Sequence, residues 1–501
     1  MKKILMMLAA LLTMGLGTAA QVLSPDKPYG PLPSKNQLRW QEMEMYAFIH
    51  YSLNTYTDQE WGFGNEDLSL FNPSDLDCRQ WVRVCKQAGM KGIIFTAKHH
   101  CGFCMWPSKY TEYSVKNTPW RGGKGDVVRE LADACKKEGL KFAVYLSPWD
   151  RNHPEYGRPE YVTDFRNQLR ELLTEYGDIF EVWFDGANGG DGWYGGANER
   201  RQITKDYYGW PETFKMIREL QPQCVIWSDA GGDRGDLRWV GTEAGFIGET
   251  NWSQVPREGR LTYQLLHYGD ENGELWVPGE TNTSIRPGWF YHKAEDEHVK
   301  SLSKLMDIYY KSVGRNSCLL LNFPIAPNGR IHPTDSLRGI AFKRMIDEVF
   351  KKNVVKEVKH PKLTNGTFTI NLKHPTAFNR FLAEEDITQG QRVKKFTIEA
   401  LVNGQWQSLR DELVENGDGL TTIGHRRIIC FPTVKATKLR FTITDIKAAI
   451  EREQSETCFD SAEREQARPW PLAEVKKLGL YLAPEITENH ISVKKQESIT
   501  E

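Results

Sequence analysis

The chain has 501 residues, a length that indicates two or three domains rather than one. Its 65 basic and 66 acidic residues nearly cancel, giving a net charge of −1, and they are mixed along the sequence. This balance excludes the strongly basic proteins that bind nucleic acids or membrane surfaces, so we expect neither kind of partner.

The first twenty residues have the pattern of a secretory signal peptide. Two lysines follow Met1, residues 4–16 form an apolar stretch, and Thr18-Ala19-Ala20 supplies small residues for cleavage before Gln21. The apolar stretch is short for a membrane span, and no other long apolar run follows it. We therefore expect residues 1–20 to be removed and the mature protein to be exported, either periplasmic or secreted.

Residues 21–353 alternate buried-strand patterns with amphipathic helices. The predicted strands are 46–50, 92–97, 142–146, 179–185, 225–227 and 318–322, and the clearest helices are 77–88, 126–138, 161–176 and 208–220. Repeated strand–helix units predict an α/β fold, a (β/α)8-type barrel. An open doubly wound sheet is the alternative, but no Gly-rich phosphate loop follows the first strand, and we expect no cofactor.

The pattern changes after residue 353. Short alternating, Thr-rich runs occur at 367–372, 395–401, 427–431 and 438–443, and turns such as Asn403-Gly404 and Asn416-Gly417 lie between them. These features predict a β-sandwich accessory domain over 354–486. Residues 487–501 form a polar tail.

The cysteines do not indicate a metal site. There are nine, and Cys101 and Cys104 form a C-x-x-C that follows two histidines. A zinc site needs a second pair of ligands at suitable spacing, and none lies nearby in the sequence. We expect no bound metal, and either a disulfide or buried thiols at this pair.

Asp185 is the most informative residue of the predicted barrel. It closes the apolar run that begins at Ile179, and Gly186 follows at once. A buried strand has no structural use for an unpaired carboxylate, because burying a charge without a partner is costly. The simple alternative is an Asp that caps a helix or a turn, whereas the C-terminal end of a barrel strand is where catalytic groups gather.

Other polar side chains share this predicted end of the barrel. They are His50, His99, His100, Tyr145, Trp183 and, on later loops, Glu243 and Glu249. Histidines and tryptophans around two carboxylates, without a cofactor motif, favour the hydrolysis of glycosides. One carboxylate must attack or stabilise the anomeric carbon, while the other must carry a proton for the leaving oxygen.

The sequence resembles the α-L-fucosidases of glycoside hydrolase family 29. The similar stretches are Ala47-Phe-Ile-His50, Glu60-Trp61, Ala97-Lys-His-His100, Ser147-Pro-Trp-Asp150, Trp183-Phe-Asp-Gly186 and Arg286-Pro-Gly-Trp-Phe-Tyr291. The resemblance covers the barrel and extends to the C-terminal sandwich. It implies a retaining enzyme that removes terminal fucose from fucosylated oligosaccharides or glycoconjugates by double displacement.

The resemblance also implies roles for particular residues. Asp185 matches the nucleophile, and Trp289 matches a further wall of the pocket. The residues that match the fucose-binding pocket are His50, Glu60, Trp61, His99, His100, Tyr145 and Trp183. Glu280 is a candidate for contacts with the aglycone.

The acid/base matches less directly. The segment Asp236-Leu-Arg-Trp-Val-Gly-Thr-Glu243-Ala-Gly-Phe resembles a subgroup selective for α-1,3 and α-1,4 linkages, whose acid/base lies in an Asn-Glu-Ala-Gly motif. Thr242 replaces the Asn here. Glu243 is therefore the predicted acid/base, with Glu249 as its rival. Two other functions stay open: an inactive, fucose-binding barrel, and a retaining hydrolase for another sugar.

Overall fold

The computed structural model describes residues 31–230, 234–351, 353–414, 420–447 and 474–486. Eight parallel strands lie in the order β7-β4-β3-β2-β1-β12-β11-β8, and a parallel bridge from Trp227 to Leu237 brings the two ends together. The strands are β1 (Met45–Ile49), β2 (Gly92–Lys98), β3 (Lys141–Leu146), β4 (Ile179–Phe184), β7 (Val225–Ser228), β8 (Arg238–Trp239), β11 (Gly279–Ser284) and β12 (Cys318–Asn322). The predicted barrel is confirmed, and the open sheet is wrong.

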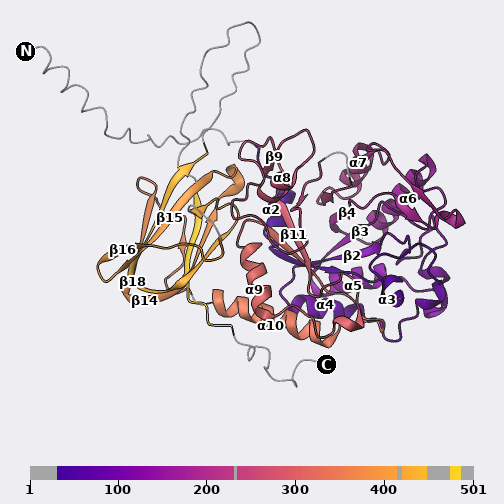
Figure 1. Ribbon diagram of the computed structural model, residues 1–501, viewed down its shortest axis with the longest axis horizontal. Coiled ribbons are helices and arrows are strands. Elements are labelled where there is room, and N and C mark those ends of the chain that lie inside the picture. Colours follow the sequence, from indigo (N-terminus) through magenta and orange to yellow (C-terminus); the bar gives the residue numbers. More distant parts are fainter. Residues whose placement is uncertain (1–30, 231–233, 352, 415–419, 448–473, 487–501) are drawn as a thin grey trace, which may run out of the picture.

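Helices surround the barrel on the right of Figure 1. The longer ones are α4 (Cys78–Gln87), α5 (Val127–Glu138), α6 (Pro159–Glu175), α7 (Trp210–Leu220), α9 (Leu302–Lys311) and α10 (Pro333–Phe350). Asp77 and Asp126 cap α4 and α5, because their carboxylates accept hydrogen bonds from backbone N–H groups of the first turn. Gly139 ends α5 with a φ of 76°, a conformation that glycine adopts without strain.

Two barrel strands, β8 and β11, escape the sequence pattern. The strand β11 reads Gly-Glu-Thr-Asn-Thr-Ser, and all six residues are buried although none is apolar and large. Some of its buried polar groups have partners inside the protein, such as Glu280, which accepts a hydrogen bond from the indole of Trp183. A search for apolar runs therefore passes over it.

Large aromatic side chains fill the barrel interior. The rings of Trp183 and Trp227 stack with centroids 3.6 Å apart, and Tyr145 stacks on the other side of Trp183. Two carboxyl groups, Glu181 and Glu280, are buried below these rings. Burial and the neighbouring Glu280 raise the pKa of Glu181, and burial also raises the pKa of Glu280.

The C-terminal domain, on the left of Figure 1, is an antiparallel β-sandwich in the order β13-β19-β14-β18-β15-β16, with β17 beside β15. Its strands are β13 (Val358–Lys359), β14 (Thr367–Glu385), β15 (Val393–Val402), β16 (Gln405–Ser408), β17 (Leu420–Thr421), β18 (Arg427–Ile446) and β19 (Val475–Tyr481). The predicted turn at Asn403-Gly404 joins β15 to β16, and both residues have positive φ. The turn predicted at Asn416-Gly417 lies outside the described residues.

The short strands predicted at 427–431 and 438–443 are wrong as separate elements. Both belong to the 20-residue strand β18, which pairs with β14 on each side of Pro432. A register shift there, between Phe378 and Arg380 on β14, accommodates the proline as a bulge. A proline cannot donate a hydrogen bond to a neighbouring strand, so in a sequence it resembles the end of a strand.

The structure also bears on a disulfide, a metal site and a membrane span. Cys101 and Cys104 are buried free thiols, so the disulfide alternative does not apply. In the described part of the chain, no group of three or more Cys, His, Asp or Glu side chains could hold a metal ion. No helix in that part is both long enough and apolar enough to cross a membrane.

Candidate active site

Asp185 is the first residue after β4, at the C-terminal end of the barrel. Its Oδ1 accepts the N–H of Ala187 at 2.9 Å, and its Oδ2 accepts the hydroxyl of Tyr145 at 3.1 Å. The side chain is 30% exposed, and its Oδ2 lies 3.8 Å from Nε2 of His100. Two donors thus orient a carboxylate that is still open to solvent and to a ligand.

His100 lies beside Asp185 in a fixed tautomer. The hydroxyl of Ser147 donates to the carbonyl of Trp149 at 2.7 Å, so its oxygen accepts Nδ1–H of His100, also at 2.7 Å. Burial lowers the pKa of His100 to about 4, although Asp185 opposes that shift. The neutral ring therefore turns a free Nε2 lone pair toward Asp185, where a ligand hydroxyl can donate.

His50, directly after β1, is held in the same way. The amide of Asn322 donates to Ser284 and to the carbonyl of Trp289, so its oxygen accepts Nδ1–H of His50 at 2.8 Å. Burial lowers the pKa of His50 to about 3, and Nε2 is left as an acceptor. His99 stacks on Tyr145 next to both rings, and burial also lowers its pKa.

These shifts predict how stability depends on pH. Histidines of the unfolded chain titrate near pH 6.5. Between pH 6.5 and about 4 they therefore bind protons, while His50 and His100 of the folded protein stay neutral. We expect the free energy of unfolding to fall as pH drops through this window. Urea denaturation at several pH values measures it, and His50→Gln should lessen the fall. An equal fall in this variant would contradict the prediction.

Aromatic side chains form the walls of the site. Trp61 is 52% exposed, and the edges of its ring meet His100 and Trp149. Tyr145, which donates to Asp185, and Trp183, which stacks on Tyr145, are buried. An exposed indole above a buried aromatic floor offers an apolar face to a sugar ring.

Glu60 contacts the protein more extensively than the sequence suggested. It accepts the backbone N–H groups of Trp289 and Phe290 at 2.9 and 3.0 Å, and Nε2 of His292 lies 2.8 Å from its Oε1. Trp289 in turn packs against His50, with ring centroids 5.2 Å apart. Glu60 therefore fixes the segment that carries Trp289 beside the pocket.

The structure separates the two candidate acids. Glu243 accepts a hydrogen bond from Nε1 of Trp289 at 3.1 Å. Desolvation raises the pKa of Glu243, and the charges of Asp185 and Glu60 raise it further, against the opposing Trp289 bond. Glu249 instead lies where its segment meets the sandwich, and its carbonyl accepts the hydroxyl of Thr422. Glu243 thus contacts the pocket through Trp289, and the charge of Asp185 contributes to its raised pKa.

Glu280 needs correction as an aglycone contact. It is 1% exposed inside the barrel, where it accepts hydrogen bonds from Trp183 at 2.9 Å and from Tyr46. A leaving group at the mouth of the barrel has no access to it. This burial could not be predicted from the sequence, because a glutamate in a run of polar residues resembles part of a surface loop.

Two polar residues near the site were not singled out from the sequence. Asp229 follows β7 as Asp185 follows β4, and its backbone N–H donates to the carbonyl of Phe184. Desolvation and the charge of Asp185 raise the pKa of Asp229 to about 6. Asn322, the last residue of β12, orients His50. Their positions at strand ends were the available signal.

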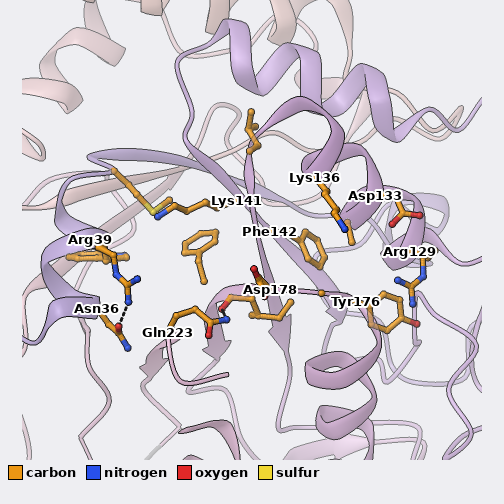
Figure 2. Close-up of a pocket in the computed structure, with 17 residues that line it drawn as sticks. Asn36, Arg39, Arg129, Asp133, Lys136, Lys141, Phe142, Tyr176, Asp178 and Gln223 are labelled. Atoms are coloured by element: carbon orange, nitrogen blue, oxygen red, sulfur yellow. Dashed lines mark hydrogen bonds between the residues drawn. The ribbon is translucent and has the colours of Figure 1, made fainter. Parts of the chain in front are cut away.

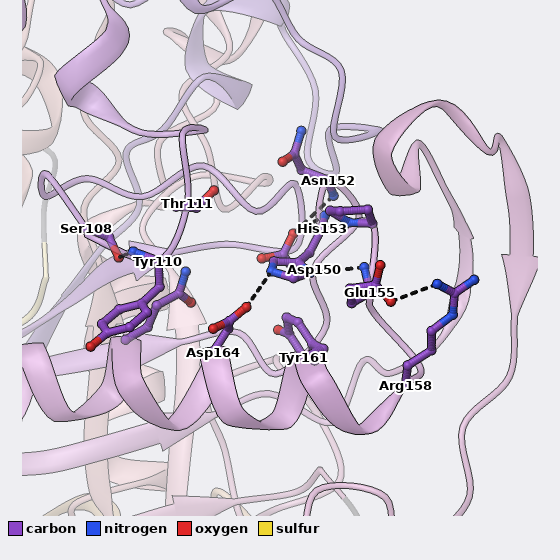
Figure 3. A network of polar contacts seen from close by, with 12 residues as sticks. Ser108, Tyr110, Thr111, Asp150, Asn152, His153, Glu155, Arg158, Tyr161 and Asp164 are labelled. Atoms are coloured by element: carbon purple, nitrogen blue, oxygen red, sulfur yellow. Dashed lines mark hydrogen bonds and ion pairs between the residues drawn. The ribbon is translucent and has the colours of Figure 1, made fainter.

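A buried ion pair supports the loop that orients His100. Nζ of Lys98, at the end of β2, lies 3.1 Å from Oδ2 of Asp150. Oδ1 of Asp150 accepts the N–H groups of Asn152 and His153, and His153 in turn contacts Asp164 at 3.3 Å (Figure 3). The pair fixes the loop after β3, which carries Ser147 and Trp149.

Breaking this pair should destabilise the fold. Lys98→Met leaves Asp150 buried and unpaired, so we expect a loss of about 3–5 kcal/mol in the free energy of unfolding. Urea denaturation measures the change. The control is Lys86→Met, whose exposed contact with Glu138 should contribute about 1 kcal/mol at most. Equal effects of the two substitutions would contradict the prediction.

Two cavities lie away from Asp185. One of about 520 Å³ opens at the N-terminal ends of β3 and β4, with Arg39, Lys141 and Phe142 in its wall (Figure 2). The other, of about 570 Å³, lies between the 110–117 segment and residues 152–154. Among the described residues, their linings include none of the predicted site residues.

The strand ends of this barrel bring together an open carboxylate, a second carboxylate of raised pKa, neutral histidines and an exposed indole. This combination is typical of a glycoside hydrolase. The family model described as α-L-fucosidase matches residues 32–341. The chain belongs to the α-L-fucosidases of glycoside hydrolase family 29.

Individual relatives agree with this family. The chain is 39% identical to putative α-L-fucosidase 1 of Oryza sativa subsp. japonica over 470 residues, which cover 87% of this chain and 86% of that protein. It is similar to the crystal structure of a family 29 member from an unknown rumen bacterium, with a TM-score of 0.86 and 72% identity over 92% and 79% of the two chains. A Ruminococcus gnavus family 29 fucosidase in complex with fucose gives a TM-score of 0.75 at 26% identity, over 93% and 98%.

Proposed function

We propose that this α-L-fucosidase acts with retention of anomeric configuration, with Asp185 as the nucleophile and Glu243 as the acid/base. The observation that carries the proposal is the coupling of two carboxylates at one end of the barrel. Asp185 is hydrogen-bonded yet open, and its charge helps to raise the pKa of Glu243. That asymmetry is what a nucleophile and a proton donor need.

In the first step, a carboxylate oxygen of Asp185 attacks the anomeric carbon, and Glu243 passes its proton to the departing glycosidic oxygen. In the second step, Glu243 takes a proton from water, which attacks the same carbon and releases Asp185. Tyr145 and the N–H of Ala187 stabilise the carboxylate when it is free. Both steps balance without any further reactant.

The pocket recognises fucose through acceptors of fixed orientation. Neutral His50 and His100 each present a free Nε2, which accepts a hydrogen bond from a ring hydroxyl. His99 and Glu60 complete the polar side, while Trp61 and Trp289 cover apolar parts of the sugar. An apolar wall against the methyl group at C5 separates fucose from galactose.

We infer a preference for α-1,3 and α-1,4 linkages. The support is the segment around Glu243, which resembles the subgroup with that selectivity apart from Thr242. On this assignment the leaving sugar lies near Trp289, whose indole donates to Glu243.

Two measurements test these assignments. Hydrolysis of α-1,2, α-1,3, α-1,4 and α-1,6 fucosides should be fastest for the α-1,3 and α-1,4 compounds, and equal rates would contradict the linkage preference. The first product seen by proton NMR should be α-fucose, and β-fucose would contradict retention. An aryl galactoside serves as the control for sugar selectivity.

We also propose that the protein is exported, on the strength of its N-terminal sequence alone. Residues 1–30 lie outside the described part of the chain. Sequencing the N-terminus of the protein recovered from the periplasm or the medium should find Gln21 first. Intact protein with Met1 in the cytoplasm would contradict export.

A further inference from the structure

His292 lies between two carboxylates at the edge of the site. Its Nδ1 is 2.6 Å from Oδ1 of Asp58, and its Nε2 is 2.8 Å from Oε1 of Glu60. A carboxylate can only accept, so both ring nitrogens must donate, and the ring carries a positive charge. Burial alone would lower the pKa of His292, but the bonds to Asp58 and Glu60 outweigh it and raise the pKa.

The charge of His292 is balanced by the two carboxylates that contact its ring. Only Asp58 and Glu60 face the ring in the hydrogen bonds of the described residues. The guanidinium of Arg286 donates to the carbonyl of His292 at 3.3 Å, and it is neutralised by Asp296 and Asp335. The Glu295 carboxylate accepts the N–H of Gly288.

Glu60 connects His292 to the backbone of the segment that carries Trp289. It accepts N–H groups from Trp289 and Phe290 while it pairs with His292. Gly288 packs so closely here that a Cβ would lie 2.7 Å from Oε1 of Glu60 and 3.0 Å from Cδ2 of His292. The carbonyl of Trp289 accepts the amide of Asn322 at 2.8 Å, so this residue is held at both ends of its main chain.

Trp289 connects the segment to Glu243. Its indole Nε1 donates to Oε2 of Glu243 at 3.1 Å, and this bond opposes the rise of the Glu243 pKa. The chain of contacts is therefore continuous, from Asp58 through His292, Glu60 and the backbone of Trp289 to the indole and Glu243. No other donor to the Glu243 side chain occurs among the described hydrogen bonds.

We propose that His292 is a positioning residue: as an imidazolium clamped by Asp58 and Glu60, it holds Trp289 in place and so sets the orientation and proton affinity of Glu243. The inference rests on the proposed role of Glu243 as acid/base. His292 itself does not touch the reacting atoms. Its loss should weaken protonation of the leaving group more than it weakens binding of the sugar.

The first experiment compares His292→Phe with His298→Phe. His298 is an exposed histidine nearby whose ring contacts only the carbonyl of Ala294 among the described hydrogen bonds, so its variant should behave as wild type. For His292→Phe we expect kcat/KM to fall about 10- to 100-fold for a fucosyl oligosaccharide, which needs acid assistance, and about threefold at most for a 4-nitrophenyl fucoside.

The pH profile gives a second readout that a merely structural role would not move. Without the Trp289 bond, the pKa of Glu243 should rise, so the basic limb of the kcat/KM profile of His292→Phe should move to higher pH. Equal losses on both substrates, with an unmoved basic limb, would overturn the proposal.

The native protein provides a test that needs no drastic variant. In ¹⁵N NMR spectra at pH 7, His292 should be doubly protonated, and Asp58→Asn, an exposed substitution, should lower its pKa. A neutral His292 at pH 7 would overturn the proposal. The proposed function fails separately: if Glu243→Ala shows no dependence on the leaving group, the acid/base assignment itself is wrong.

Discussion

Asp185→Asn should reduce hydrolysis of every fucoside by about 10³-fold or more, because the first displacement loses its nucleophile. The fold should survive, since the amide keeps the shape of the side chain and its oxygen can still accept the N–H of Ala187. The measurement is kcat for an aryl fucoside together with near-UV circular dichroism. Unlike a general acid, a nucleophile is needed even for an activated leaving group.

Asp229→Asn is the matched control for this substitution. Asp229 also follows a barrel strand and lies close enough to Asp185 for their charges to interact. Because we assign it no covalent role, its variant should keep measurable turnover on the same substrate. If Asp229→Asn were inactive and Asp185→Asn stayed active, the nucleophile would be Asp229 and our assignment would be wrong.

Glu243→Ala should show the largest dependence on the leaving group. For natural oligosaccharides we expect kcat/KM to fall about 10²- to 10⁴-fold, the usual contribution of a general acid. An aryl fucoside needs little protonation, so its first step should be spared. Added azide should then raise turnover, because it attacks the fucosyl enzyme without help from a base, and the azide product can be detected by mass spectrometry.

Glu249→Ala is the comparison for that experiment. Glu249 lies against the sandwich, where Thr250 and Thr421 share a hydrogen bond of 2.7 Å. We expect similar activity losses on aryl and natural substrates, and no rescue by azide. If Glu249→Ala shows the leaving-group pattern and Glu243→Ala does not, the two assignments are reversed.

The barrel could be predicted from its apolar strands, because a strand buried on both faces leaves a continuous run such as residues 318–322. The strand β11 could not, since its buried side chains are polar, and contacts such as those of Glu280 with Trp183 and of Thr281 with the carbonyl of Cys318 involve residues elsewhere in the chain. Glu280 shows the same limit, because its burial depends on Trp183 and Tyr46. The long strand β18 reads in the sequence as two short runs, 427–431 and 438–443, whereas a bulge beside Pro432 keeps the strand continuous.

The candidate site was predictable where a side chain follows a strand directly, as Asp185 and His50 do. Contacts between side chains and distant backbone were not predictable, because sequence spacing carries no information about them. Glu60 and Trp289 are 229 residues apart, and their hydrogen bond defines where the indole lies. The same holds for His292, whose two carboxylate partners lie more than 230 residues earlier.

The contact between barrel and sandwich has a consequence for engineering. Asn251, a few residues after Glu243, is buried and donates to the carbonyls of Arg315 and Asn316, while its own carbonyl accepts Gln391 of the sandwich. The guanidinium of Arg315 reaches the carbonyl of Leu413. A barrel separated from the sandwich near residue 353 would expose these buried polar groups. Asn251 would lose its contact with Gln391, and Arg315 would lose its contact with Leu413. The sandwich is therefore not a detachable module. A minimal catalyst or a chimera must take the barrel and sandwich residues of this interface from the same protein.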